Sequence, residues 1–157
     1  MKNLRTVALC VSISLSSICS FAQKTDIPIN EPNLNKPQLF QNLPDKIPVN
    51  MDNINSWFMG EVGRPISLKL TEANNLQFEG NVVSTVSKYE NSIQSTIVNS
   101  INYPGARLVI TKITDKDGAI SYTGRILSLQ HGDLFELKNE NNQYFLIKRK
   151  FYDLVNE

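Results

Sequence analysis

The sequence predicts an all-β protein: a small antiparallel meander of about seven strands that forms a barrel or a strongly coiled sheet, with one short N-terminal helix. Three observations support this fold class. Apolar and polar residues alternate with a period of two from Ile66 onward. Turn-forming residues recur at regular spacing between the alternating runs. Gly80 and Gly124 lie in the middle of two long runs, where glycine often marks a sharp bend.

The predicted strands are short and closely spaced. Because parallel neighbours need long crossover connections and these runs are joined by only a few residues, the sheet is expected to be antiparallel. The two longest predicted runs, which contain Gly80 and Gly124, suit a small barrel or a coiled sheet because they can bend at the glycine. The predicted strands span 66–70, 76–88, 93–100, 106–114, 119–129, 134–138 and 143–150.

Residues 1–22 have the three parts of a secretory signal peptide. Lys2 and Arg5 form the positive region, an apolar core follows, and Ser20 and Ala22 are the small residues of a cleavage site. We therefore expect a secreted or periplasmic bacterial protein that is cleaved after Ala22. The apolar core is shorter than the ~20 residues that cross a bilayer, so no membrane span is predicted.

Cleavage would change both the cysteine content and the charge. Cys10 and Cys19 lie in the signal peptide, so the mature chain is expected to be free of disulfides and of thiol chemistry. Removing Lys2 and Arg5 leaves 14 basic residues against 15 acidic residues, a net charge of −1. A nearly neutral chain has no global field to attract nucleic acid, and no nucleic-acid partner is expected.

The segment 23–50 holds five of the seven prolines, whereas every glycine lies later in the chain. Proline removes an amide donor and forces its predecessor into extended geometry, so this segment is predicted to be an extended arm. Its second half carries apolar residues that we expect to cover the β-domain. Ile27, Ile29 and Leu34, in its first half, are the predicted contacts to a partner protein.

The segment 51–59 predicts one short amphipathic helix ahead of a β-domain at 60–157. Trp57 and Phe58 fall on the same face of this helix. About two helical turns are unstable alone in water, so this face is expected to pack against the sheet.

Two motifs contain residues that are common in functional sites, and both are predicted to be turns. Asp117 and Gly118 match the middle of an EF-hand loop, but the first carboxylate and the final glutamate of that loop are missing, so a hairpin turn is predicted. His131 is the only histidine, and with no cysteine in the mature chain a zinc site is not expected. No catalytic, metal or cofactor residue is assigned.

Basic residues are frequent near the C-terminus, where Lys148, Arg149 and Lys150 form a run beside aromatic residues. A nucleic-acid surface has this composition. The mature charge and the signal peptide favour the other interpretation, a final strand whose long side chains protect a sheet edge.

The ingredients of the common active sites are missing, so the protein is predicted not to be an enzyme. Its layout of signal, extended arm and disulfide-free β-domain resembles that of detached prodomains or inhibitors of secreted proteases. That resemblance implies a non-enzymatic protein-binding module, inhibitor-like or prodomain-like, with a protein partner in the envelope or secretome. The alternative is a carrier of a small apolar ligand in a barrel cavity, and no cofactor is expected in either case.

Overall fold

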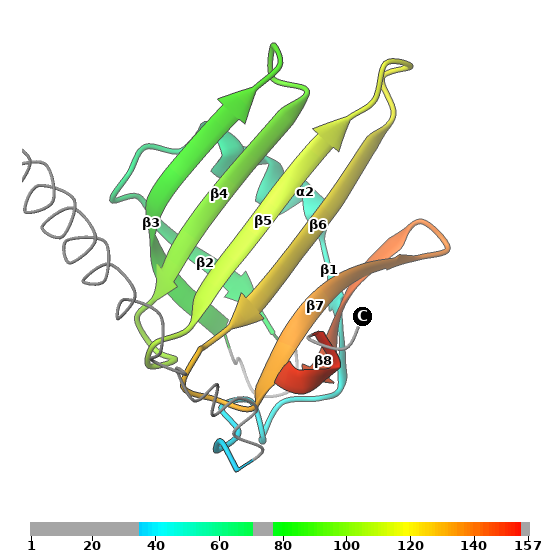
Figure 1. Cartoon of the computed structure of the whole chain (residues 1–157). Coiled ribbons are helices and arrows are strands. Elements are labelled where there is room, and N and C mark those ends of the chain that lie inside the picture. Colours follow the sequence, from blue (N-terminus) through cyan, green and yellow to red (C-terminus); the bar gives the residue numbers. More distant parts are fainter. Residues whose placement is uncertain (1–34, 71–76, 155–157) are drawn as a thin grey trace, which may run out of the picture. The chain divides into compact units, whose positions relative to one another are not determined.

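Eight antiparallel strands form one curled sheet in the computed structural model, which describes residues 35–70 and 77–154 (Figure 1). The strand order is β1-β8-β7-β6-β5-β4-β3-β2, so chain neighbours are also sheet neighbours from β2 to β8. The strands are β1 (Lys46–Val49), β2 (Pro65–Lys69), β3 (Gln77–Lys88), β4 (Ile93–Ser100), β5 (Arg107–Thr114), β6 (Ile120–Leu127), β7 (Asp133–Glu140) and β8 (Gln143–Lys150). The sheet curls into a half-barrel, which confirms the predicted all-β meander.

The eighth strand, β1, lies inside the segment predicted to be an arm. It pairs with β8, with Ile47 opposite Leu146 and Val49 opposite Tyr144. Proline cannot donate to a sheet ladder and therefore disfavours a central strand. In agreement with this, β1 is an edge strand. Since β8 has neighbours on both sides, the prediction that Lys148–Lys150 protect a sheet edge is wrong.

The predicted helix consists of two short pieces, α2 (Met51–Asn55) and the 3-10 turn η2 (Ser56–Met59). Asn50 caps α2, because its side-chain oxygen accepts a hydrogen bond from the Asp52 amide at 2.9 Å. Ile54, Trp57 and Phe58 are buried. The prediction that Trp57 packs between the helix and the sheet is thus confirmed.

The concave side of the sheet holds the core. Alternate residues of every strand point inward, as Leu108 and Ile110 do on β5, and pack against the helix at one end. Gly80 and Gly124 belong to this inward-facing set. A Cβ atom on Gly80 would lie 2.3 Å from the Asn99 carbonyl oxygen, and one on Gly124 would lie 2.8 Å from the Val109 carbonyl oxygen. Both positions therefore let a neighbouring strand approach closely.

The chain before β1 closes the other end of the half-barrel. Phe40 is 1% exposed and packs against the rings of Tyr103 and Phe135, with ring centroids 5.4 and 5.1 Å apart. The buried Asp133 carboxylate accepts hydrogen bonds from the amides of Leu39 at 2.6 Å and Phe40 at 2.8 Å. The second half of the arm therefore covers the domain, as predicted.

A short 3-10 turn, η3 (Phe151–Leu154), follows β8 directly. Its first amide donates to the Gly132 carbonyl at 2.8 Å, and the Asp153 carboxylate accepts from the Lys150 amide at 3.3 Å. Within the described part of the chain, no helix has the length and apolar character needed to cross a membrane.

Candidate functional site

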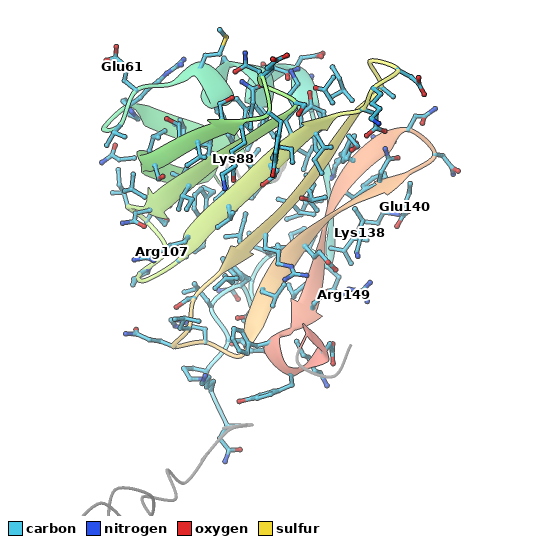
Figure 2. All side chains as sticks on the ribbon, turned by 45° about the horizontal axis from the view of Figure 1, so that its top comes forward. Glu61, Lys88, Arg107, Lys138, Glu140 and Arg149 are labelled. Carbon is cyan, nitrogen blue, oxygen red and sulfur yellow. The ribbon has the colours of Figure 1, made fainter. Side chains whose placement is uncertain are left out.

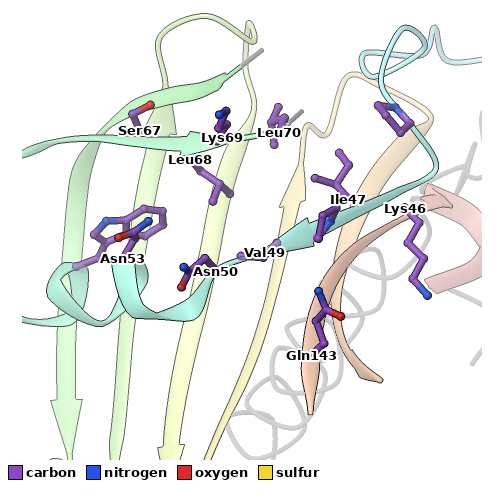
Figure 3. A pocket seen from close by; sticks show the side chains of 13 residues that line it. Lys46, Ile47, Val49, Asn50, Asn53, Ser67, Leu68, Lys69, Leu70 and Gln143 are labelled. Carbon is purple, nitrogen blue, oxygen red and sulfur yellow. The ribbon is translucent and has the colours of Figure 1, made fainter. Parts of the chain in front are cut away.

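The two edge strands, β1 and β2, face each other across a cleft of about 660 Å³ (Figure 3). We call it the seam cleft, because it lies where the curled sheet stays open. It is lined by Pro44, Lys46, Ile47, Pro48, Val49, Asn50, Asn53, Trp57, Ser67, Leu68, Lys69, Leu70 and Gln143. The sequence patterns did not predict this site.

The backbone register shows which groups of β1 face the cleft. The Lys148 amide donates to the Asp45 carbonyl at 2.8 Å, so Asp45, Ile47 and Val49 direct their backbone groups toward β8. The alternate residues, Lys46 and Pro48, direct theirs away from β8. Pro48 has no amide hydrogen, so the outer edge of β1 lacks a donor there.

The backbone register also shows which groups of β2 face the cleft. The Val82 amide donates to the Arg64 carbonyl at 2.9 Å, so Ile66 and Leu68 direct their backbone groups toward β3. Pro65, Ser67 and Lys69 direct theirs outward. Each edge strand therefore has a proline on its outward edge, a device that discourages pairing with another strand. The Ser67 amide and carbonyl form the outward backbone pair in the middle of β2.

The floor and the rim of the seam cleft differ in chemistry. Ile47, Val49, Trp57, Leu68 and Leu70 are all buried and form an apolar floor. The rim is polar and consists of Lys46, Asn50, Asn53, Ser67, Lys69 and Gln143. The lining residues, all in the described part of the chain, include two lysines and no acidic residue. Lys46 forms an ion pair with Glu140 and lies over the Phe145 ring at 4.1 Å.

Behind the floor, a cavity of about 10 Å³ lies between Trp57 of the helix and the inward side chains of the strands, among them Leu108, Ile110 and Leu146. This is about the space of one water-sized sphere. Trp57 lines both the cleft and this cavity, and its carbonyl accepts a hydrogen bond from the buried Thr96 hydroxyl at 3.3 Å.

The residues singled out from the sequence are distributed over several regions. Ile27, Ile29 and Leu34 lie outside the described residues. Phe58 stacks on Tyr122, with ring centroids 6.2 Å apart. Asp117 and Gly118 lie in the β5–β6 turn, where Gly118 has a φ of +79° and donates its amide to the Asp115 carbonyl at 2.9 Å. Of the residues predicted to be structural, only Trp57 lines the seam cleft.

The strongest candidate for acid–base chemistry is the region of His131. Its Nδ1 atom lies 2.8 Å from the Ser128 hydroxyl, but Ser128 is buried at 1% exposure and offers a substrate no access. Asp133 lies nearby in sequence, and its carboxylate already binds the two amides of the arm. The geometry therefore assigns this region to structure. Among the described residues no group of three His, Cys, Asp or Glu side chains lies close enough to hold a metal ion.

Among the residues that the structure describes, one side chain has a clearly shifted pKa. Burial raises the pKa of the Tyr103 hydroxyl above its ordinary value, because the charged phenolate loses hydration between the rings of Phe40 and Phe78. Burial thus favours the neutral form of the Tyr103 hydroxyl, whose ring lies at the end of the half-barrel that the arm closes.

A signal for the seam was present in the sequence. Pro48 and Pro65 each interrupt or begin a short alternating apolar run, and proline in such a run marks an edge strand. Comparison with protein-family models, with curated proteins and with solved structures finds no match for this chain.

Proposed function

We propose that this chain is an exported, non-enzymatic protein-binding module that takes up an extended segment of a partner protein along the seam cleft. The observation that supports the proposal is the pair of edge strands facing each other over an apolar floor. An extended segment can add to a sheet edge through its backbone, while alternate side chains supply specificity.

The cleft suggests the pattern of such a segment. A strand lying against β2 would reach the outward amide and carbonyl of Ser67, and every second side chain would point to the floor of Trp57 and Leu68. Apolar residues suit these positions. The intervening side chains would face the polar rim of the described lining, whose two lysines already interact with other groups. A segment that alternates apolar with polar residues therefore fits best.

The prolines on the two edge strands would make the binding of a partner segment selective. They reduce the number of outward donors, which hinders indiscriminate pairing with any exposed strand. Binding then depends on the floor contacts and on the few remaining backbone groups, which gives selectivity. An inhibitor-like or prodomain-like role toward an exported enzyme would use this mode, with Ile27, Ile29 and Leu34 as additional contacts from the arm.

A small apolar ligand is the second candidate, since a cleft of about 660 Å³ falls within the ~300–1,000 Å³ typical of ligand sites. The ligand would lie in the seam cleft, because the interior cavity of about 10 Å³ leaves no room. The outward amide and carbonyl of Ser67 can pair with the backbone of a peptide but not with an apolar ligand, so they favour the peptide.

Selection of a phage-displayed library of random 12-residue peptides on the immobilised exported chain tests the proposal. Trp57 is the only tryptophan and lines the cleft, so its fluorescence reports binding of selected peptides to the protein in solution. Ser67→Pro removes the outward amide and should weaken binding about tenfold or more, the effect of losing one backbone hydrogen bond with its neighbouring contact. Ser67→Ala keeps the amide and is the matched control.

Two outcomes would contradict the peptide proposal. One is selected peptides that bind wild type and Ser67→Pro equally well. The other is a failure to select any peptide while an apolar fluorescent fatty acid binds and shifts the Trp57 emission, which would favour the carrier.

A further inference from the structure

The outward face of β5–β8 carries four basic side chains on neighbouring strands. They are Arg107, Arg125, Lys138 and Arg149, which we call the basic face. Arg107, Arg125 and Lys138 each adjoin a buried residue of their strand, as Arg125 does Ile126, and Arg149 has the same parity as the outward residues of β8. Figure 2 shows this side of the sheet with Arg107, Lys138 and Arg149 labelled.

A single carboxylate lies among these side chains. Glu136 is opposite Arg125 in the β6–β7 register. Its oxygens lie 3.1 Å from the Lys138 Nζ atom, 3.5 Å from the Arg125 Nη2 atom and 3.9 Å from the Arg149 Nε atom. The Glu136 side chain is only 13% exposed, whereas its three partners are each about 45% exposed. The carboxylate is therefore covered, while the cations reach solvent.

The charges of this face do not balance. One carboxylate shared by three cations leaves two positive charges in excess, and Arg107 adds a third. The only other acidic residue facing outward on these four fully described strands is Glu140, which is paired with Lys46 of β1. Because the mature chain is expected to be nearly neutral, this excess is a local feature of one face.

Apolar side chains lie in the same row of the sheet as this cluster. The registers align Ile97, Val109, Arg125, Glu136 and Ile147 across five strands. Ile97, Val109 and Ile147 are partly exposed. A face that combines arginines with partly exposed apolar residues has the composition of a protein interface, where arginine is enriched and lysine is depleted.

We propose that the basic face is a second docking surface, which binds an acidic, carboxylate-rich segment of a protein partner. Arginine binds a carboxylate through two parallel hydrogen bonds, and the single Glu136 carboxylate balances only one of its three cations. A partner carboxylate would therefore meet cations whose charge is not yet balanced. This surface is distinct from the seam cleft, with which it shares no lining residue.

Binding of fluorescein-labelled decaglutamate to the exported full-length chain tests the proposal, with decaglutamine as the uncharged control peptide. The double variant Arg125→Gln/Arg149→Gln should weaken decaglutamate binding about tenfold or more, because it removes two cations that would pair with glutamate carboxylates. Lys88→Gln/Lys116→Gln removes the same charge elsewhere and should change binding less than about twofold. Raising the salt concentration should weaken binding of the wild type.

Glu136→Gln separates a binding role from a purely structural one. Removing the covered carboxylate releases three cations, so decaglutamate binding should strengthen several-fold; thermal unfolding of each variant confirms that the fold is retained. Equal losses in the two double variants, or weaker binding in folded Glu136→Gln, would overturn the proposal.

The source of the anionic partner is tested in parallel arms. Phosphatidylglycerol vesicles or duplex DNA that bind through Arg125 and Arg149 while decaglutamate does not would also overturn it. Ser67→Pro should leave decaglutamate binding unchanged, so the outcome is independent of the seam proposal.

Discussion

The half-barrel is closed at its two ends and open along its seam, and the two regions are built differently. At one end the helix inserts Trp57 and Phe58, and at the other the arm inserts Phe40. Side chains from short, irregular segments thus close the ends by burial. Along the seam, only backbone pairing between β1 and β2 would complete the barrel, and each strand carries a proline on the edge that faces the other.

The difference shows that burial and hydrogen bonding act on separate parts of this fold. An aromatic side chain gains stability from apolar area wherever it finds a complementary surface, so the ends tolerate irregular backbone. A sheet edge needs matched donors and acceptors in register. The side chains at the closed ends should therefore contribute most to the free energy of unfolding. The backbone edges at the seam should determine whether the chain pairs with another strand.

The largest effect is expected at the helix end. Trp57→Ala should lower the free energy of unfolding by ~3–5 kcal/mol, because it removes a large buried aromatic side chain and leaves a cavity. Urea unfolding measures the change. Met59→Ala, at a residue that is 87% exposed in the same short turn, is the control and should cost much less. A loss below ~1 kcal/mol for Trp57→Ala would mean that burial at this end is not a main source of stability.

The close approach of the strands gives the next effect. Gly80→Ala places a Cβ 2.3 Å from the Asn99 carbonyl oxygen and should cost ~1–3 kcal/mol in unfolding free energy, the range for overpacking. Gly124→Ala, where the nearest backbone oxygen is 2.8 Å away, should cost less. Chemical unfolding of both variants ranks them, and the reverse order would show that the backbone gives way more readily at Gly80.

The arm end depends on one carboxylate. Asp133→Asn keeps the shape of the side chain but offers one acceptor in place of two, so the amide of Leu39 or of Phe40 loses its partner. We expect a loss of ~1–2 kcal/mol, the cost of one unsatisfied buried donor. Hydrogen exchange at these two amides, measured with thermal unfolding, should show faster exchange at one of them. Unchanged exchange at both would mean that Asp133 does not hold the arm.

The smallest stability effect and the clearest change in association are expected at the seam. Pro48→Val/Pro65→Val restores two outward amides, should change the unfolding free energy by less than ~1 kcal/mol, and should promote edge-to-edge dimers. Analytical ultracentrifugation over a range of concentrations measures the oligomeric state. A strictly monomeric double variant would show that the prolines are not what keeps the seam from pairing with another strand.

Much of the fold follows from local patterns that the sequence displays directly. The period-two alternation placed the strands from β2 to β8 with small errors at their ends; the predicted strand 93–100 coincides with β4. The short helix was equally accessible, because Trp57 and Phe58 share one of its faces. Signals of this kind depend on residues a few positions apart, so they are visible without knowledge of the fold.

The seam and the basic face depend on contacts between distant residues, and only the tertiary structure decided them. β1 lies in a proline-rich stretch whose composition predicts no central strand, and it forms because β8 offers an unpaired edge that its backbone can complete. The arm is held by Asp133, 93 residues away from Phe40 in the chain. Likewise, the position of Glu136 among three cations comes from the register of β6, β7 and β8. Alternation determines which face a side chain occupies, but the pairing register determines its neighbours, and that register is set by the packing of the whole sheet.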